Sequence, residues 1–251
     1  MRTDQIALQL YTVREEAARD FLGTLRRVAE LGYRAVEFAG YGGIPATELR
    51  ARLDEYGLRA PGAHVPFADF AERMEPTLAD LRTLGCEFAV VPSLPRESRE
   101  SPAQIRRAAA LFERWGDACR ATGLRFGYHN HAFEFSPLDE GGRSVTPFEI
   151  LAATDPALVA LELDVYWAQH AGVDPVDLIQ RHGGRVPLLH VKDMADDADR
   201  ADVPVGEGTL PWPRILAAAA AAGTRWYVVE QDHPRDALDD VRRSLRNLEQ
   251  L

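Results

Sequence analysis

The chain has 251 residues, of which 46% are apolar and 27% are charged, a composition typical of a folded globular protein. Its formal net charge of −10 would repel nucleic-acid phosphates, so we expect no nucleic-acid partner. No apolar run approaches the roughly 20 residues that span a bilayer, the first residues are too polar for a secretory signal, and the only cysteines are Cys86 and Cys119, so we expect a cytoplasmic protein with no membrane partner.

Strand-like and helix-like segments alternate along the chain. A strand is predicted over Ile6–Val13, and apolar residues at helical spacing predict a helix over Glu15–Leu31. After this point, helix-like segments repeatedly end in glycine and continue into short apolar runs, as buried parallel strands do. These runs lie in LGYRAVEFAG, YGLRAPGAHV, LGCEFAVVPS, TGLRFGYHNH, GGRVPLLHVKD and AGTRWYVVEQD. A further strand is predicted over Leu158–Trp167.

Helix starts can be read between these strands. Ser101-Pro102 and Thr146-Pro147 each combine an N-cap residue with proline at the first helical position, and a capping partner stands three residues after each cap. Asp174-Pro175 begins a helix in the same way. The alanine run 217–222 is predicted to be a helix packed on a sheet, because alanine is the best helix former.

The resulting count is eight strands in strict alternation with eight helices, and no linker interrupts it. We therefore predict a single (β/α)8 TIM barrel, one domain over residues 1–251. An open doubly wound sheet is the alternative. That fold usually carries a glycine-rich phosphate loop after its first strand, where this chain has YTVREE.

Polar residues cluster at the predicted C-terminal strand ends, where such barrels build their active sites. They are Gln9, Tyr11, Glu37, His64, Pro92, Ser93, His129, Asn130, His131, Glu134, Glu162, Asp164, Tyr166, His190, Lys192, Glu230 and Asp232. Five of the seven histidines, with His233 as the fifth, stand at or just past a strand end. Burying so many ionisable groups is costly without a counter-ion, so we expect a bound divalent metal.

Six stretches, LQLYTVRE, YHNHAFEF, LELDVYW, LLHVKD, VGEG and VVEQD, occur in this order along the whole chain. Together they resemble the xylose-isomerase-like TIM-barrel superfamily, and more closely its sugar phosphate isomerase/epimerase group. Relatives include inosose dehydratase, tagatose-type 3-epimerases, hydroxypyruvate isomerase and endonuclease IV. The resemblance implies one divalent cation held by Glu, Asp, His and Glu from the last four strands.

Asp164, His190 and Glu230 match the last three of these ligands. The first ligand departs from the pattern, because this sequence has His129 where many relatives have glutamate. We expect Glu134 to supply that carboxylate, with His129 or His131 as alternatives. Glu162 is a less favoured candidate, and its other interpretation is a partner in a buried salt bridge. Three oxygen donors and one nitrogen suit Mn²⁺, with Mg²⁺, Co²⁺ or Zn²⁺ as alternatives.

A cation with open positions can chelate a hydroxyl and a carbonyl oxygen of a sugar and acidify the adjacent C–H. The resemblance therefore implies a metal-dependent isomerase or epimerase that acts through an enediolate on a small keto-sugar or polyol. A dehydratase or keto-glycoside lyase, which eliminates a β-oxygen substituent, is the alternative that the YHNH stretch favours. A phosphodiesterase and a non-catalytic carbohydrate-binding barrel are less favoured. Barrels of this group often pair, so a homo-oligomer remains open.

His129 and His131 are the predicted acid–base pair, because imidazole titrates near neutral pH; hydrogen bonding to the ligands is their alternative role. Lys192, the only lysine of the chain, should point into the same mouth as His190. Nearby metal and imidazole should lower its pKa and allow proton transfer; holding a substrate oxygen, or pairing with a neighbouring carboxylate, are the other interpretations. The predicted substrate contacts are Gln9, Glu37, His64, Glu207 and Trp167.

Overall fold

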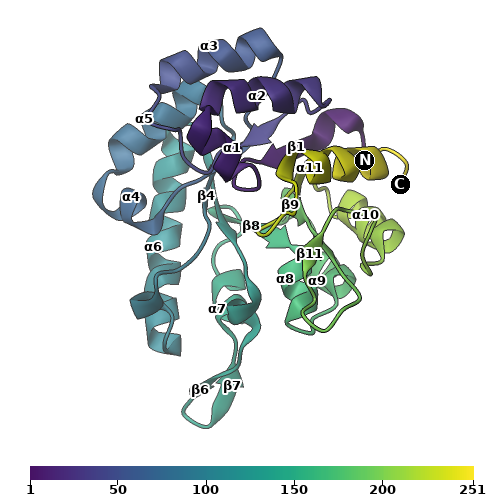
Figure 1. The fold of residues 1–251 in the computed structure, drawn as a ribbon. Coiled ribbons are helices and arrows are strands. Elements are labelled where there is room, and N and C mark those ends of the chain that lie inside the picture. Colours follow the sequence, from purple (N-terminus) through teal and green to yellow (C-terminus); the bar gives the residue numbers. More distant parts are fainter.

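Parallel strands form the centre of the structure, a computed structural model that describes residues 1–251 (Figure 1). The 8-stranded sheet has the order β2-β1-β12-β9-β8-β5-β4-β3. Parallel bridges from Ala35 to Arg59 and from Phe38 to Ala63 join its two edges, so the predicted (β/α)8 barrel is confirmed. The strands are β1 (Ile6–Gln9), β2 (Val36–Glu37), β3 (Gly62–His64), β4 (Phe88–Val91), β5 (Arg125–His129), β8 (Val159–Asp164), β9 (Leu188–Val191) and β12 (Trp226–Val229).

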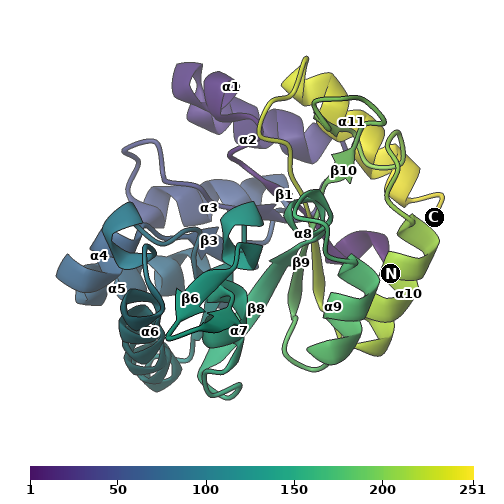
Figure 2. The same ribbon diagram turned by 90° about the horizontal axis from the view of Figure 1, so that it is seen from below.

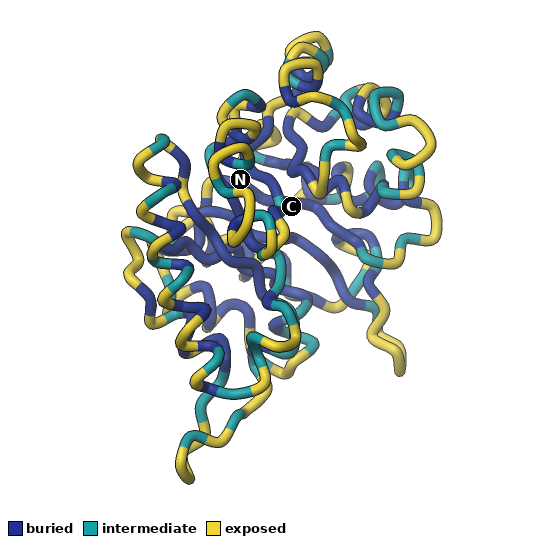
Figure 3. Tube along the Cα trace, turned by 90° about the vertical axis from the view of Figure 1, so that its left-hand side faces the viewer, coloured by how far each residue is buried: buried dark blue, intermediate teal, exposed yellow.

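Helices surround this barrel, and their exposed outer faces contrast with the buried strands (Figures 2 and 3). They are α1 (Arg14–Arg19), α2 (Phe21–Glu30), α3 (Ala46–Tyr56), α4 (Phe67–Glu72), α5 (Met74–Leu84), α6 (Pro102–Ala121), α7 (Pro147–Ala152), α8 (Val165–His170), α9 (Pro175–Arg181), α10 (Trp212–Ala221) and α11 (Ala237–Leu248). The predicted helix starts are confirmed at α6, α7 and α9, where Ser101, Thr146 and Asp174 cap the helix and proline follows. The alanine run belongs to α10.

The inside of the barrel has an apolar layer below a polar one. Eight buried residues form the apolar layer: Ala7, Ala35, Phe88, Val90, Ala160, Leu188, Trp226 and Val228. Because side chains alternate along a strand, the residues two positions further on point the same way. Those residues include Gln9, Glu37, Glu162, His190 and Glu230. The strand periodicity therefore places these polar side chains in the layer next to the apolar one, toward the C-terminal ends of the strands.

The structure contains more helices and strands than the strict alternation of eight strands with eight helices that the sequence predicts. Asp20 accepts a hydrogen bond from the backbone N–H of Gly23 and starts α2, so the single helix expected over Glu15–Leu31 is divided into α1 and α2. The strand expected to run to Trp167 ends at Asp164, where α8 begins. Two small antiparallel ladders are inserted after barrel strands: β6 (Leu138–Glu140) with β7 (Arg143–Val145), and β10 (Asp193–Met194) with β11 (Asp202–Val203).

Candidate active site

Strand register brings the polar side chains of four barrel strands together. In the parallel pairing, His129 of β5 stands beside Glu162 of β8, and Asp164 of β8 stands beside His190 of β9. Glu230 follows directly after β12, the strand next to β9. All five of these residues are buried. The C-terminal end of the barrel therefore holds a dense group of carboxylates and imidazoles, as the sequence predicted.

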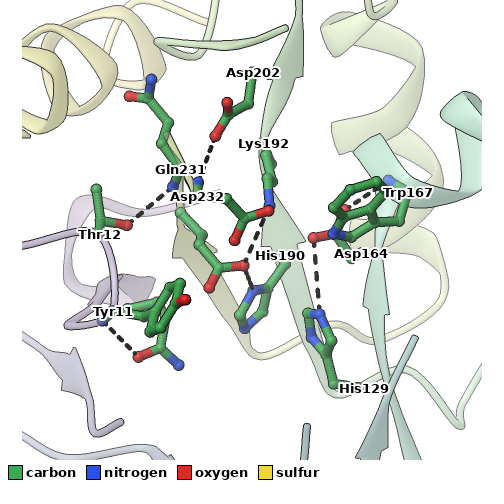
Figure 4. Close-up of polar contacts among 12 residues, drawn as sticks. Tyr11, Thr12, His129, Asp164, Trp167, His190, Lys192, Asp202, Gln231 and Asp232 are labelled. Carbon is green, nitrogen blue, oxygen red and sulfur yellow. Dashed lines mark hydrogen bonds and ion pairs between the residues drawn. The ribbon is translucent and has the colours of Figure 1, made fainter. Parts of the chain in front are cut away.

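Four of these residues form a group that can hold a metal ion. Ligand atoms of His129, Asp164, His190 and Glu230 all lie within 4.8 Å of one another (Figure 4). His190 Nδ1 is 2.9 Å from Glu230 Oε2, and His129 Nε2 is 3.9 Å from Asp164 Oδ2. The structure thus brings together three of the four predicted ligands and adds His129, one of the alternatives for the fourth position.

Asp164 provides the test of whether a cation fits. Its Oδ1 accepts a hydrogen bond of 2.9 Å from the backbone N–H of Trp167 and caps α8, whereas its Oδ2 is buried and has no hydrogen-bond partner. Burial raises the pKa of this carboxyl to about 7. An unpaired carboxylate oxygen in a dry site is costly, and a cation bound there would remove that cost. The donor set therefore fits a divalent metal.

Further carboxylates contact one ring nitrogen of each imidazole in this group. Glu162 Oε2 lies 3.1 Å from His129 Nδ1 and 3.2 Å from His190 Nε2. Glu37 Oε2 lies 2.9 Å from His190 Nε2. Carboxylates on the ring nitrogen that does not bind metal fix the tautomer and orientation of ligand histidines. Glu162 is thus more than an isolated salt-bridge partner, since one of its oxygens also lies 2.6 Å from His64 Nε2.

His64, His129, Glu162 and His190 form an overlapping second group within the same 4.8 Å limit. Taking Glu162 as a metal ligand would remove the carboxylate that orients both His129 and His190. Glu162 Oε1 and Asp164 Oδ2 are both buried without a partner, so the choice between the groups rests on the first group keeping that support. We therefore assign the candidate metal centre to the first group.

Glu134 does not reach this centre. Its carboxylate accepts a hydrogen bond from the Tyr128 hydroxyl and another, 2.8 Å long, from the backbone N–H of His131. The side chain is fully buried in this arrangement, and burial raises its pKa to about 8. The expectation that Glu134 swings back to the metal is at odds with this geometry, because the short helix over Ala132–Phe135 turns the side chain toward Tyr128.

The two imidazoles of the predicted acid–base pair, His129 and His131, differ in whether their ring nitrogens have partners. Their ring centroids are 5.0 Å apart. Both nitrogens of His129 face carboxylates, Glu162 and Asp164, whereas Nδ1 of His131 is buried without a partner. Burial lowers the pKa of His131 to about 4 and the pKa of His129 well below its usual value. Both rings are therefore neutral near pH 7, and His131 is the one with a nitrogen free to accept a proton.

Lys192 is completely buried and donates a hydrogen bond to Asp232. Its Nζ also lies 3.8 Å from Glu230 Oε2 and about 5 Å from the ring centroids of Tyr166 and Trp167. Burial alone would lower its pKa, but Glu230, Asp164 and Asp232 outweigh burial and raise it. In this arrangement the neighbouring carboxylates favour the charged form of Lys192, and the fall in pKa that we expect beside a bound metal stays a prediction. Lys192 carries a fixed positive charge.

The predicted substrate contacts divide into three positions. Gln9 and Glu37 are fully buried and hydrogen bond to each other at 2.8 Å, so they support His190 from below. His64 and Trp167 are partly exposed and border the site. Glu207 forms an ion pair with Arg243 of α11.

The segment that carries Glu207 is fixed by Asp193, whose carboxylate accepts hydrogen bonds from the backbone N–H groups of Gly206 and Gly208. It also accepts one from the indole of Trp212. This anchoring explains why Glu207 turns toward α11: its two neighbouring residues are tied to the barrel while its own side chain points outward. The sequence offered no signal for this role of Asp193.

Comparison with known proteins is consistent with this geometry. The sequence model of the xylose isomerase-like TIM barrel family matches residues 25–251. An inosose dehydratase from Geobacillus kaustophilus is 29% identical over 196 residues, which are 69% of this chain and 62% of that protein. The chain thus spans less than two-thirds of the length of this curated relative.

Solved structures with the same fold add to this comparison. A sugar phosphate isomerase/epimerase from Parabacteroides distasonis superposes with a TM-score of 0.86 and 27% identity, over 99% of this chain and 94% of its own. The IolI protein, whose crystal structure contains a zinc atom, superposes with a TM-score of 0.76 and 15% identity, over 98% and 97% of the two chains. The second likeness is one of fold alone. No helix of this chain has the length and apolar character needed to cross a membrane.

Proposed function

The chain belongs to the xylose isomerase-like TIM-barrel family, and we propose that it is a metal-dependent isomerase or epimerase of a keto-sugar or oxidised polyol. The reaction begins with removal of a proton from the carbon next to the carbonyl. Return of the proton to the other face gives an epimer, and its return to the neighbouring carbon, after an internal proton shift, gives an isomer. Elimination of a β-oxygen substituent is the second candidate, and the match to an inosose dehydratase over 69% of the chain supports it.

The observation that carries this proposal is the group of His129, Asp164, His190 and Glu230, with its unpaired buried carboxylate oxygen. A divalent cation held by these four residues supplies Lewis-acid polarisation of a carbonyl oxygen. Two nitrogen and two oxygen donors favour Mn²⁺, Co²⁺ or Zn²⁺ over Mg²⁺, because imidazole is a poorer ligand for magnesium.

The residues of the chain supply the remaining chemistry. His131 is the proposed proton acceptor, because its Nδ1 is unpaired and its ring is neutral. The positive charge of Lys192 lies behind Glu230 and stabilises negative charge that develops on the substrate oxygens. Glu37 and Glu162 hold His129 and His190 in position. The Trp167 ring, 5.6 Å from the His131 ring, forms an apolar wall of the site.

The first experiment measures bound metal by elemental mass spectrometry, on protein purified without chelators and then incubated with Mn²⁺. We expect about one equivalent in the wild type and a loss of roughly tenfold or more in metal affinity for Asp164→Asn. The matched control is Asp177→Asn, an exposed aspartate on α9 that should keep the metal. Absence of metal in the wild type, or full retention in Asp164→Asn, would contradict the proposal.

The second experiment follows exchange of substrate C–H for deuterium from solvent by NMR, with a panel of keto-sugars. Metal-loaded wild type should catalyse this exchange, and His131→Gln should slow it by about 10² to 10⁴ while keeping its metal. The same spectra separate the two candidate reactions. An epimer or isomer appears in one case, and an unsaturated product with loss of the β-substituent appears in the other.

A further inference from the structure

The chain segment after β5 leaves the barrel beside the candidate metal centre and carries His131. The backbone pairing of β5 with β8 reaches as far as His129 and Glu162. Beyond this pair, the side chain of Asn130 continues the contact between the two segments. Its Oδ1 accepts a hydrogen bond of 3.0 Å from the backbone N–H of Asp164, and its Nδ2 donates one of 3.3 Å to the Asp164 carbonyl. Asn130 therefore ties the backbone just before His131 to a residue of the candidate metal centre.

A second contact holds the backbone of His131 itself. Glu134 Oε2 accepts a hydrogen bond of 2.8 Å from the His131 N–H, and Glu134 Oε1 accepts one from the hydroxyl of Tyr128. That hydroxyl in turn accepts a hydrogen bond of 3.2 Å from the backbone N–H of Leu94, in the loop after β4. These four residues thus form a continuous chain of hydrogen bonds that runs from the loop after β4 to the backbone of His131.

The chain of hydrogen bonds is buried, and it uses both oxygens of the carboxylate. Leu94 and Tyr128 are each 2% exposed, and Glu134 is 0% exposed. A buried polar network in which every member is paired is rigid, whereas removal of one member leaves its partners unpaired at a cost. The imidazole of His131 differs, because its Nδ1 has no partner. The backbone of His131 is therefore fixed, while a nitrogen of its ring stays free to react.

A similar contact elsewhere in the chain shows what a simple helix cap looks like. At the start of α7, Glu149 Oε2 accepts a hydrogen bond of 2.7 Å from the backbone N–H of Thr146, three residues earlier, and this contact is exposed. Glu134 and His131 have the same spacing, but the helix that they cap is a 3-10 helix of 4 residues. Burying a carboxyl group is costly, and so short a helix does not require it. The burial of Glu134 therefore indicates a role beyond capping.

We propose that Glu134 is a positioning residue, which acts through the backbone of His131 and sets where its imidazole lies relative to the candidate metal centre. This inference rests on the proposed function, in which His131 accepts the proton of the substrate. A proton acceptor must lie within hydrogen-bonding reach of the group that it deprotonates, and a displacement of about 1 Å can slow a reaction by about 10². Glu134 itself contacts neither the substrate nor the metal.

The first test needs no substrate and follows the backbone amide of His131 by NMR. In Glu134→Met we expect hydrogen exchange of this amide to be faster by about tenfold or more, and its order parameter to fall from about 0.85 to below about 0.6. Glu134→Gln has the shape of the neutral carboxyl group and keeps an acceptor, so it should resemble wild type. Glu134→Asp is too short to reach Tyr128 and His131 together, so it should change the amide in the same direction and replaces Glu134→Met if that variant does not fold.

Glu149→Met is the matched control, because it removes the equivalent contact with Thr146 and should leave the amide of His131 unchanged. An unchanged His131 amide in folded Glu134→Met or Glu134→Asp would overturn the inference. An equal change in Glu149→Met would also overturn it, because the effect would then be one of general stability.

The second test measures exchange of substrate C–H for deuterium on the metal-loaded protein, with the keto-sugars that test the proposed function. Glu134→Met and Glu134→Asp should lower kcat by about 10 to 10² with KM and metal affinity near the wild-type values, and Glu134→Gln should restore kcat to within about threefold of wild type. The double variant His131→Gln/Glu134→Met should be no slower than His131→Gln, because Glu134 acts only through His131.

The outcomes separate this inference from the proposed function. Additive losses in the double variant, or equal losses of kcat in Glu134→Gln and Glu134→Met, would refute the positioning role. Slow exchange in His131→Gln combined with wild-type exchange in Glu134→Met would refute the positioning role alone. Wild-type exchange in His131→Gln would instead refute the assignment of His131 as the proton acceptor, on which the proposed function depends.

Discussion

Replacing Lys192 with methionine should destabilise the chain by about 3 kcal/mol. The Lys192 side chain has 0% exposure and donates a hydrogen bond to Asp232, whose side chain is 19% exposed. Removing one partner of a buried ion pair typically costs about 3 to 5 kcal/mol, because the other charge is left buried without compensation. The partial exposure of Asp232 places the expected value at the lower end of that range. Methionine fills a similar volume, so the loss reports charge more than packing.

The assay is urea unfolding followed by circular dichroism. With a slope near 3 kcal/mol per molar urea, the expected loss lowers the midpoint by about 1 M. The double variant Lys192→Met/Asp232→Asn removes both charges and should recover about half of the loss. Arg52→Met is the control, because the pair of Arg52 with Glu55 is exposed and should contribute little. A midpoint for Lys192→Met within 0.2 M of wild type, or strict additivity in the double variant, would refute this reasoning.

Further predictions concern stability and its dependence on pH. Burial raises the folded-state pKa of Glu134 from 4.5 to about 8, so its neutral form stabilises the fold at low pH, and that contribution is lost as the pH rises through this window. Wild type should therefore lose up to about 1.4 kcal/mol per pH unit relative to Glu134→Gln between pH 5 and 8; parallel pH profiles in urea unfolding would contradict this. Gly208→Ala should cost about 1 to 3 kcal/mol and lower the melting temperature, because an added Cβ would lie 2.3 Å from Asp193 Oδ1 and 2.4 Å from the Met194 carbonyl. Gly183→Ala, whose Cβ would meet only ordinary contacts, serves as the control, and equal melting temperatures for the two variants would refute the steric argument.

The sequence allowed the barrel and part of the candidate site to be predicted, because strand periodicity is a local property. Two-residue alternation places Asp164, His190 and Glu230 at the ends of their strands, the family resemblance implies that they are ligands, and the structure brings them together. The positions of side chains beyond the strand ends are not determined by strand alternation. Glu134 leaves the strand on a short helix and meets Tyr128, and this contact depends on tertiary packing.

The same distinction explains the remaining differences. The direction of the pKa shift of Lys192 depends on which charges lie nearest, and strand spacing alone did not identify Asp232 as its partner. The strand predicted over Leu158–Trp167 ends at Asp164, because the carboxylate of Asp164 caps a helix that starts at that point. Glu207 lies in a loop whose course is fixed by Asp193, a residue that strand alternation does not direct into the site.

The double use of Asp164 restricts how this protein can change by mutation. One oxygen of the carboxylate begins α8, and the other faces His129 in the candidate metal centre. Glutamate would keep the charge but move it one methylene further from the helix start, and asparagine would keep a helix cap but replace one oxygen with a poor metal ligand. Single substitutions that preserve one role therefore sacrifice the other. The helix α8 also carries Tyr166 and Trp167, the aromatic rings around Lys192. A substitution of Asp164 is therefore expected to impair either the candidate metal centre or the start of this helix, and neither kind of substitution would be neutral in evolution.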